Sequence, residues 1–126
     1  MPSDTLGILL ISGGHARAHY AFVLATAAAA LGRKVTMFAT NAGCHALLAD
    51  WSGLTDAGRD ALIAGRGVAG LDVLREAAAD LEIRMIACEA GLRAEALDRA
   101  TLLPGVEIAG VATFLAAVGD GQFISL

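Results

Sequence analysis

Cys88 is the residue of this sequence whose position best suits covalent chemistry. It closes the apolar run 83–87 and precedes the stretch 89–97, which has the composition of a helix. Such a cysteine lies at the carboxyl end of a strand, the edge at which open α/β sheets form their ligand crevice. The amino end of the following helix favours a thiolate, the nucleophilic form of the side chain. Cys88 is therefore a candidate nucleophile, although a cysteine among apolar residues also serves as a small buried hydrophobe.

Cys44 follows an earlier predicted strand in the same way, but the helix behind it is shorter. His45 is its neighbour, and adjacent residues of a helix diverge by about 100°. We therefore do not expect an imidazole–thiolate pair between them. Cys44 is a candidate secondary sulfur site or resolving thiol. The two cysteines would form a redox switch only if their Cα atoms approach within about 7 Å.

The turn Ser12-Gly13-Gly14-His15 leads from the first predicted strand into a helix. It has neither the lysine of a P-loop nor the three glycines of a dinucleotide site, so nucleotide binding is not predicted. His15 could donate to an anion at this turn, but we expect a surface helix cap instead.

Asn41 and Arg93 complete the candidate set. Asn41 could line the same edge, although such residues more often satisfy the backbone of a turn. Arg93 lies about one and a half helical turns beyond Cys88, so it need not face the thiol. Cys44, His45 and the distant Cys88 lack the closely spaced ligand pairs of structural zinc sites. We predict neither a metal nor an organic cofactor.

The composition restricts the class of protein. The chain has 126 residues, of which 56% are hydrophobic and 17% charged, which is apolar for a soluble monomer. A sheet covered on both faces and surface buried in a homo-oligomer would both explain this, and we expect both. A net charge of −4 with scattered basic residues argues against nucleic acid as a partner. The longest apolar stretch, 21–31, is too short to span a bilayer, and the start of the chain does not resemble a secretory signal. We expect a cytoplasmic protein with no membrane partner and two free thiols.

The elements that must position these residues alternate along the chain. Strands are predicted at 6–11, 35–39, 83–87, 106–108 and 122–126, the first two of them buried, and helices at 15–31, 44–50, 55–63, 69–81, 89–99 and 110–118. On the first helix we expect Tyr20, Val23, Leu24, Ala27 and Leu31 to form the apolar stripe. This alternation predicts the α/β class: one domain over residues 1–126, with three α/β/α layers and a mostly parallel sheet of about five strands. The turns after the strands, which carry both cysteines, should then meet at one edge.

The chain resembles the DsrE/DsrF/TusD-like (DsrEFH-like) sulfur-relay family. The resemblance runs through nearly the whole chain and is carried by these segments: Cys88-Glu-Ala-Gly-Leu-Arg, Ala18-His19-Tyr20-Ala21, residues 31–38 and residues 106–115. It implies a compact α/β/α domain that assembles into homo- or hetero-oligomers, commonly trimers or hexamers. It also implies that Cys88 carries sulfur as a persulfide and passes it to a partner thiol, with no metal or organic cofactor. Sulfur donor and acceptor proteins are the implied partners.

Three hypotheses follow. The leading one is a sulfur carrier or sulfurtransferase-like subunit that uses Cys88. The second is a non-catalytic oligomeric binding or scaffolding protein of the same fold, in which Cys88 only packs. The third is a redox switch formed by Cys44 and Cys88.

Overall fold

The computed structural model describes residues 4–126, and its centre is a five-stranded sheet in the order β4-β3-β2-β1-β5. Every pair of neighbouring strands is parallel. The strands are β1 (Leu6–Leu10), β2 (Val35–Ala39), β3 (Arg84–Cys88), β4 (Glu107–Ala109) and β5 (Gln122–Ser125). The carboxyl ends of all five strands therefore meet at one edge of the sheet, as the sequence predicted.

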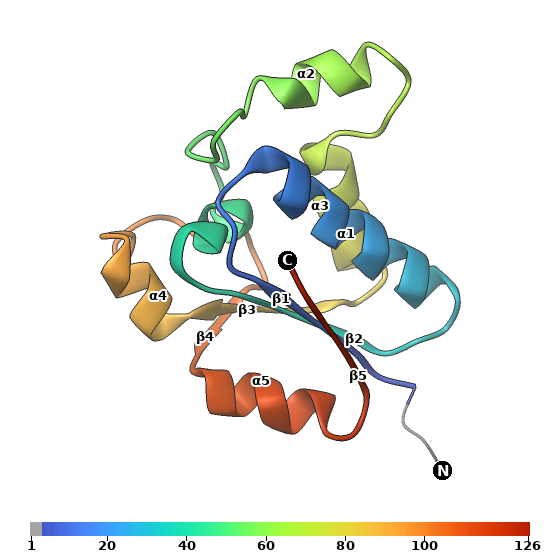
Figure 1. The fold of residues 1–126 in the computed structure, drawn as a ribbon, viewed down its shortest axis with the longest axis vertical. Coiled ribbons are helices and arrows are strands. Elements are labelled where there is room, and N and C mark those ends of the chain that lie inside the picture. The colour runs from blue at the N-terminus through green and yellow to red at the C-terminus, as the bar shows by residue number, and fades with distance from the viewer. Residues whose placement is uncertain (1–3) are drawn as a thin grey trace.

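Helices cover both faces of this sheet (Figure 1). On one face lie α1 (His15–Ala30) and α3 (Leu71–Asp80), and on the other lies α5 (Val111–Val118). The 3-10 helix η1 (Asn41–Leu47) and α4 (Glu89–Ala94) sit at the carboxyl edge, and the short α2 (Arg59–Ala64) stands off from the body. The predicted α/β class, with three layers and a parallel sheet, is confirmed.

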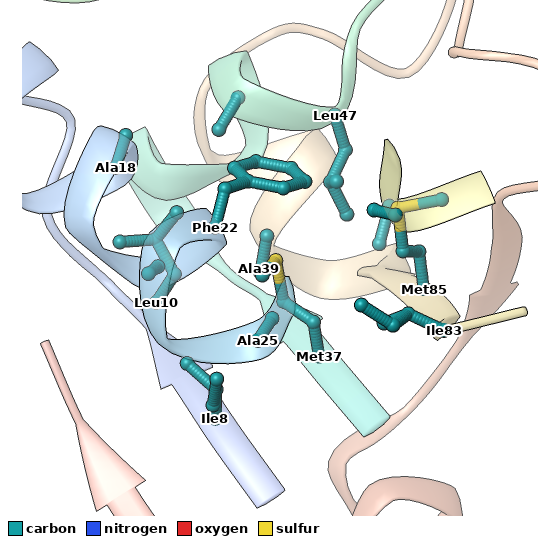
Figure 2. Close-up of a cluster of buried hydrophobic side chains, with 14 of the residues drawn as sticks. Ile8, Leu10, Ala18, Phe22, Ala25, Met37, Ala39, Leu47, Ile83 and Met85 are labelled. Carbon is teal, nitrogen blue, oxygen red and sulfur yellow. The ribbon is translucent and has the colours of Figure 1, made fainter. Parts of the chain in front are cut away.

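The two faces of the sheet have separate hydrophobic clusters. The larger cluster lies between the sheet and α1, α3 and η1, and Figure 2 shows its centre around Phe22, Met37 and Leu47. The smaller cluster lies under α5 and contains Phe38, Ile86, Cys88, Phe114 and Val118. Residues alternate between the two along a strand, since Met85 and Ala87 belong to the first cluster and Ile86 and Cys88 to the second.

The buried stripe of α1 differs from the prediction. The helix buries His15, Ala18, Ala21, Phe22, Ala25 and Ala28, whereas Tyr20 and Leu31 are exposed. Alanines and larger apolar residues occur on both sides of the helix, so periodicity alone did not distinguish them. The side with the smaller residues faces the sheet, because alanines allow the helix to approach the strands closely and leave room for Phe22.

Two other predicted helices are corrected at their ends. The helix predicted at 44–50 is η1, which starts earlier, at Asn41. The helix predicted at 89–99 stops at Ala94. Its last turn closes with Ala96 in the left-handed region (φ 55°), and the Leu97 N–H donates to the Leu92 carbonyl at 2.7 Å. Glycine usually occupies this position, so the alanine gave no sequence signal for the stop.

Candidate functional site

Cys88 occupies the junction that the sequence indicated. It is the last residue of β3 and the N-cap of α4, where its extended backbone (φ −69°, ψ 122°) turns the chain into the helix. Its Sγ accepts a hydrogen bond from the Gly91 backbone N–H at 3.3 Å. Capping side chains normally use oxygen for this contact, so here a sulfur atom satisfies one of the free donors of the helix. The contact places a backbone N–H donor directly against the sulfur atom.

The surroundings of the Cys88 side chain are apolar. The side chain is 7% exposed and packs in the cluster under α5 with Phe38, Ile86 and Phe114. Ala109 of β4 lies beside it in register. The Cys88 sulfur therefore has a backbone N–H donor on one side and apolar side chains on the other. Chemistry at this atom requires a reagent that reaches a largely covered sulfur.

Gly91 is a residue that the sequence analysis did not single out. A Cβ on Gly91 would lie 2.5 Å from the Asn41 backbone nitrogen and 2.6 Å from the Thr40 Oγ1, both far inside contact distance. The missing side chain thus allows α4 to lie directly against the end of β2. Gly91 also supplies the backbone N–H that donates a hydrogen bond to the Cys88 Sγ. A glycine inside a predicted helix was the available signal.

Cys44 lies close to Cys88 but belongs to the other face of the sheet. It is fully buried in the larger cluster, and its thiol donates to the Ala39 carbonyl at 3.5 Å. Burial raises the pKa of the Cys44 thiol from 9.0 to about 11; the Cys88 sulfur and Glu95 add to the rise, and a hydrogen bond from the Cys88 backbone partly offsets it. Cys44 is therefore protonated at neutral pH and a poor nucleophile. Both cysteines are free thiols.

The other candidate residues, Asn41, Arg93 and His45, lie in three different surroundings. Asn41 is exposed, with its backbone in the left-handed region (φ 51°), and its nitrogen lies against Gly91. Arg93 forms an exposed ion pair with Glu89 at 2.7 Å, so both charges lie outside the thiol environment. His45 is partly buried, with its ring against Gly53 rather than a sulfur atom.

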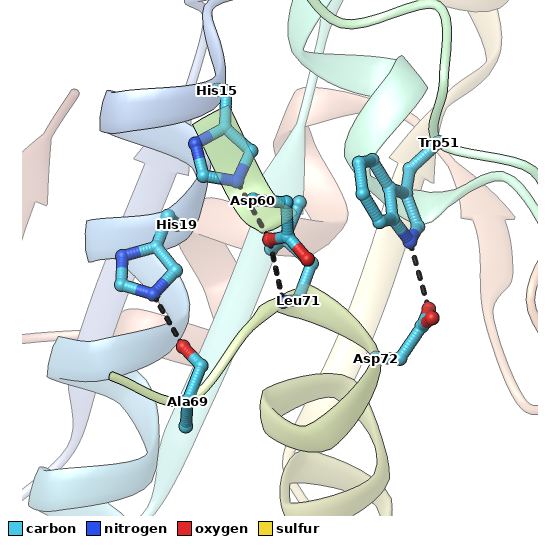
Figure 3. A network of polar contacts seen from close by, with 7 residues as sticks. All are labelled: His15, His19, Trp51, Asp60, Ala69, Leu71 and Asp72. Carbon is cyan, nitrogen blue, oxygen red and sulfur yellow. Dashed lines mark hydrogen bonds and ion pairs between the residues drawn. The ribbon is translucent and has the colours of Figure 1, made fainter. Parts of the chain in front are cut away.

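His15 is not a surface cap, and that expectation is wrong because the residue is buried. Its side chain is fully buried, and its Nε2–H donates to the Asp60 carboxylate at 2.7 Å (Figure 3). Its backbone N–H donates to the Thr55 carbonyl at 2.8 Å, so the chain itself occupies the amino end of α1. Asp60 also accepts from the Leu71 N–H at 2.9 Å. This carboxylate therefore ties α2 to the starts of both α1 and α3.

His19 and Trp51 extend the same polar network, which is structural in character. The His19 ring stacks on His15 with centroids 5.6 Å apart and donates to the Ala69 carbonyl at 2.8 Å. Trp51 Nε1–H donates to Asp72 at 2.8 Å. These contacts attach both ends of the segment 51–70 to the body of the protein (Figure 3).

The described part of the chain contains neither a candidate metal site nor a membrane-spanning helix. Within residues 4–126, no group of three or more histidine, cysteine, aspartate or glutamate side chains could hold a metal ion. Over the same range, no helix is long and apolar enough to cross a bilayer.

Comparisons with known proteins agree with the fold and with the resemblance. The chain is 27% identical to the sulfur carrier protein DsrE2 of Allochromatium vinosum, over 97% of both proteins. Its fold matches the crystal structure of the ychN protein from E. coli with a TM-score of 0.68 over the whole of both chains, at 13% identity. The family model for the DsrE/DsrF-like family matches residues 5–125. With this match over nearly its whole length, the chain belongs to the DsrE/DsrF-like family.

Proposed function

We propose that this protein is a sulfur carrier that holds a persulfide on Cys88. The observation that carries the proposal is the contact between the Cys88 Sγ and the Gly91 N–H inside an apolar shell. A fixed backbone donor stabilises an anionic sulfur, and the apolar shell limits the access of water and oxidants. The similarity to a protein named as a sulfur carrier supports the same assignment.

The proposed exchange involves one sulfur atom and no net redox change. The Cys88 thiolate attacks the outer sulfur of a donor persulfide, R–S–SH. The donor S–S bond breaks, R–S⁻ leaves with the electron pair, and Cys88–S–SH forms. An acceptor thiolate, R′–S⁻, then attacks the outer sulfur of Cys88–S–SH. This second step gives R′–S–SH and restores the Cys88 thiolate, so no metal or organic cofactor takes part.

Cys44 has no step in this exchange. Its pKa of about 11 keeps it protonated at neutral pH, and its thiol lies in the cluster on the other face of the sheet. A one-thiol carrier is therefore favoured over the switch formed by two thiols. We propose that the carrier acts as a homo-oligomer, trimeric or hexameric, in the cytoplasm, and that it receives and delivers sulfur through donor and acceptor proteins.

Intact-mass spectrometry of the purified protein with a small persulfide donor tests the proposal. We expect the wild type to gain about 32 Da, the mass of one sulfur atom in the exchange above, and to lose it again when an acceptor thiol is added. Cys88→Ala should gain nothing, and Cys44→Ala should gain the same mass as the wild type. A wild type that takes up no sulfur, or a Cys88→Ala variant that takes up the same amount, would contradict the proposal.

A second candidate is a non-catalytic scaffold of the same fold, favoured by the 7% exposure of Cys88. In that case Cys88 is a packing residue of the cluster under α5. Native Cys88 would then be alkylated as slowly as Cys44, and Cys88→Ser would destabilise the fold without removing any sulfur uptake. Rapid alkylation of Cys88 beside an unreactive Cys44 would exclude the scaffold.

A further inference from the structure

Helix α4 is capped by the sulfur atom that is loaded in the proposed function. Of the helices within residues 4–126, α4 is the one whose N-cap side chain accepts a hydrogen bond, from the Gly91 N–H to the Cys88 Sγ at 3.3 Å. α4 has only six residues, and a helix of that length depends on its caps and its packing. The stability of α4 therefore depends on what is bonded to this sulfur.

The other end of α4 is fixed by contacts that do not involve sulfur. Ala96 adopts the left-handed region (φ 55°), and the Leu97 N–H donates to the Leu92 carbonyl at 2.7 Å. Leu92 is 3% exposed and packs in the larger cluster. The carboxyl end of α4 thus has an apolar anchor, whereas its first turn depends on the Cys88 cap.

A second sulfur atom on Cys88 would have little room. The side chain lies in the cluster under α5, where the rings of Phe38 and Phe114 stack with centroids 5.2 Å apart. On the side of the helix, Gly91 already touches the end of β2, since a Cβ there would lie 2.6 Å from the Thr40 Oγ1. α4 cannot move closer to β2, but it lies at the outer margin of the fold (Figure 1). An added atom therefore displaces its first turn outward.

A second sulfur also weakens the cap itself. Thiol sulfur is a weak acceptor, and in a persulfide the same atom has a bonded neighbour in place of its proton or negative charge. The outer sulfur lies one bond further away, so it cannot accept from the Gly91 N–H unless the first turn moves. Attachment of sulfur to Cys88 therefore both crowds the first turn of α4 and weakens its cap.

We propose that α4 reports whether Cys88 carries sulfur: its first turn is ordered in the free thiol and opens when a second sulfur is attached. This role rests on the proposed function, in which Cys88 is the loaded residue. α4 carries the exposed ion pair between Glu89 and Arg93, so the empty and the loaded carrier would present different surfaces to a partner protein. Such a difference allows a donor to prefer the empty carrier and an acceptor the loaded one.

Amide hydrogen exchange, measured by NMR with and without a methylthio group on Cys88, tests the proposal. The Cys88 thiolate attacks methyl methanethiosulfonate, whose S–S bond breaks to give Cys88–S–S–CH3 and methanesulfinate. The product is a stable stand-in for the loaded state, and peptide mapping verifies that the group is on Cys88. We expect the Gly91 and Leu92 amides to exchange about 3- to 30-fold faster after the modification. The Leu81 amide, which bonds to the end of α3, is the control and should not change.

Two substitutions separate the loss of the cap from the added bulk. Cys88→Ser keeps an acceptor at the N-cap and has no thiol there, so its α4 amides should exchange at the wild-type rate or more slowly, with and without the reagent. Cys88→Ala has neither an acceptor nor an added group. Its α4 amides should therefore exchange faster than those of the wild type before any reagent is added, while the Leu81 amide stays unchanged.

Equal exchange of the α4 amides in the free and the methylthiolated protein would overturn the proposal. So would faster exchange of the control amide by the same factor, because the whole chain would then be destabilised, and so would a Cys88 that the reagent cannot modify. The persulfide donor assay decides the carrier proposal separately. If the donor leaves no sulfur on Cys88 but α4 opens on methylthiolation, the carrier proposal fails and the link between the sulfur and α4 remains. If sulfur is taken up and α4 does not change, the carrier remains and the reporting role fails.

Discussion

Replacing Gly91 by alanine tests whether the placement of α4 controls Cys88. The new Cβ would lie 2.5 Å from the Asn41 backbone nitrogen and 2.6 Å from the Thr40 Oγ1, so either α4 or the end of β2 must move. Movement of backbone in a packed site costs about 1–3 kcal/mol of folding free energy. The same movement lengthens the 3.3 Å contact from the Gly91 N–H to the Cys88 Sγ.

The size of the effect on reactivity follows from that hydrogen bond. A hydrogen bond to a charged acceptor contributes about 1.5–3 kcal/mol. Loss of the bond should therefore lower the rate at which Cys88 reacts as a thiolate by about 10- to 100-fold at constant pH. The assay is alkylation by iodoacetamide at neutral pH, followed by peptide mapping that reports Cys88 and Cys44 separately.

Gly58→Ala is the matched control for this substitution. Gly58 has helical backbone angles (φ −62°, ψ −18°), and a Cβ there would meet no atom within 4 Å. We expect wild-type stability and a wild-type Cys88 rate from the control. A Gly91→Ala protein that is folded and alkylates Cys88 at the wild-type rate or faster would refute the reasoning, because it would show that the Gly91 N–H does not activate the sulfur.

Three further predictions concern the surroundings of the site. Asp60→Asn weakens the hydrogen bonds that the carboxylate accepts from His15 and from the Leu71 N–H. It should lower the free energy of unfolding, measured by urea titration, by about 1–3 kcal/mol. Asp98→Asn, an exposed change, should not lower it. Because the Cys44 pKa rises from 9.0 to about 11 on folding, its stabilising effect should be complete below pH 9 and should be lost as the pH rises to 11. The free energy of unfolding of the wild type, minus that of Cys44→Ala, should therefore fall by about 2 kcal/mol between pH 9 and pH 11. A difference that does not change with pH would contradict the burial argument. The Arg75 guanidinium donates to three backbone carbonyls at the end of η1. Lysine cannot reproduce this planar set of donors, so Arg75→Lys should lower the free energy of unfolding by about 2–3 kcal/mol. Arg99→Lys, an exposed change, should leave it almost unchanged.

The order of elements and the position of Cys88 could be predicted because they depend on local patterns. Short apolar runs followed by turn residues indicate buried parallel strands, and parallel strands bring their carboxyl ends to one edge. This argument alone was enough to predict the position of Cys88. The family resemblance depended on the same segments, and the match of the family model over residues 5–125 confirms it.

What could not be predicted depends on contacts between distant parts of the chain. The partner of His15 is Asp60, 45 residues away on a helix that stands off from the sheet, and no local pattern connects the two. The buried stripe of α1 was chosen by close approach to the sheet, which favours small residues over the larger Tyr20 and Leu31. Gly91 is important because of Thr40 and Asn41, which are distant in sequence and adjacent only in the fold.

Sulfur transfer through Cys88 is tested most directly by one intact-mass comparison. Wild type, Cys44→Ala and Cys88→Ala are incubated with a small persulfide donor and measured before and after an acceptor thiol is added. The account predicts a gain of about 32 Da, reversed by the acceptor, in the first two proteins and no gain in the third. Equal sulfur uptake by all three proteins, or no uptake by the wild type, would contradict it.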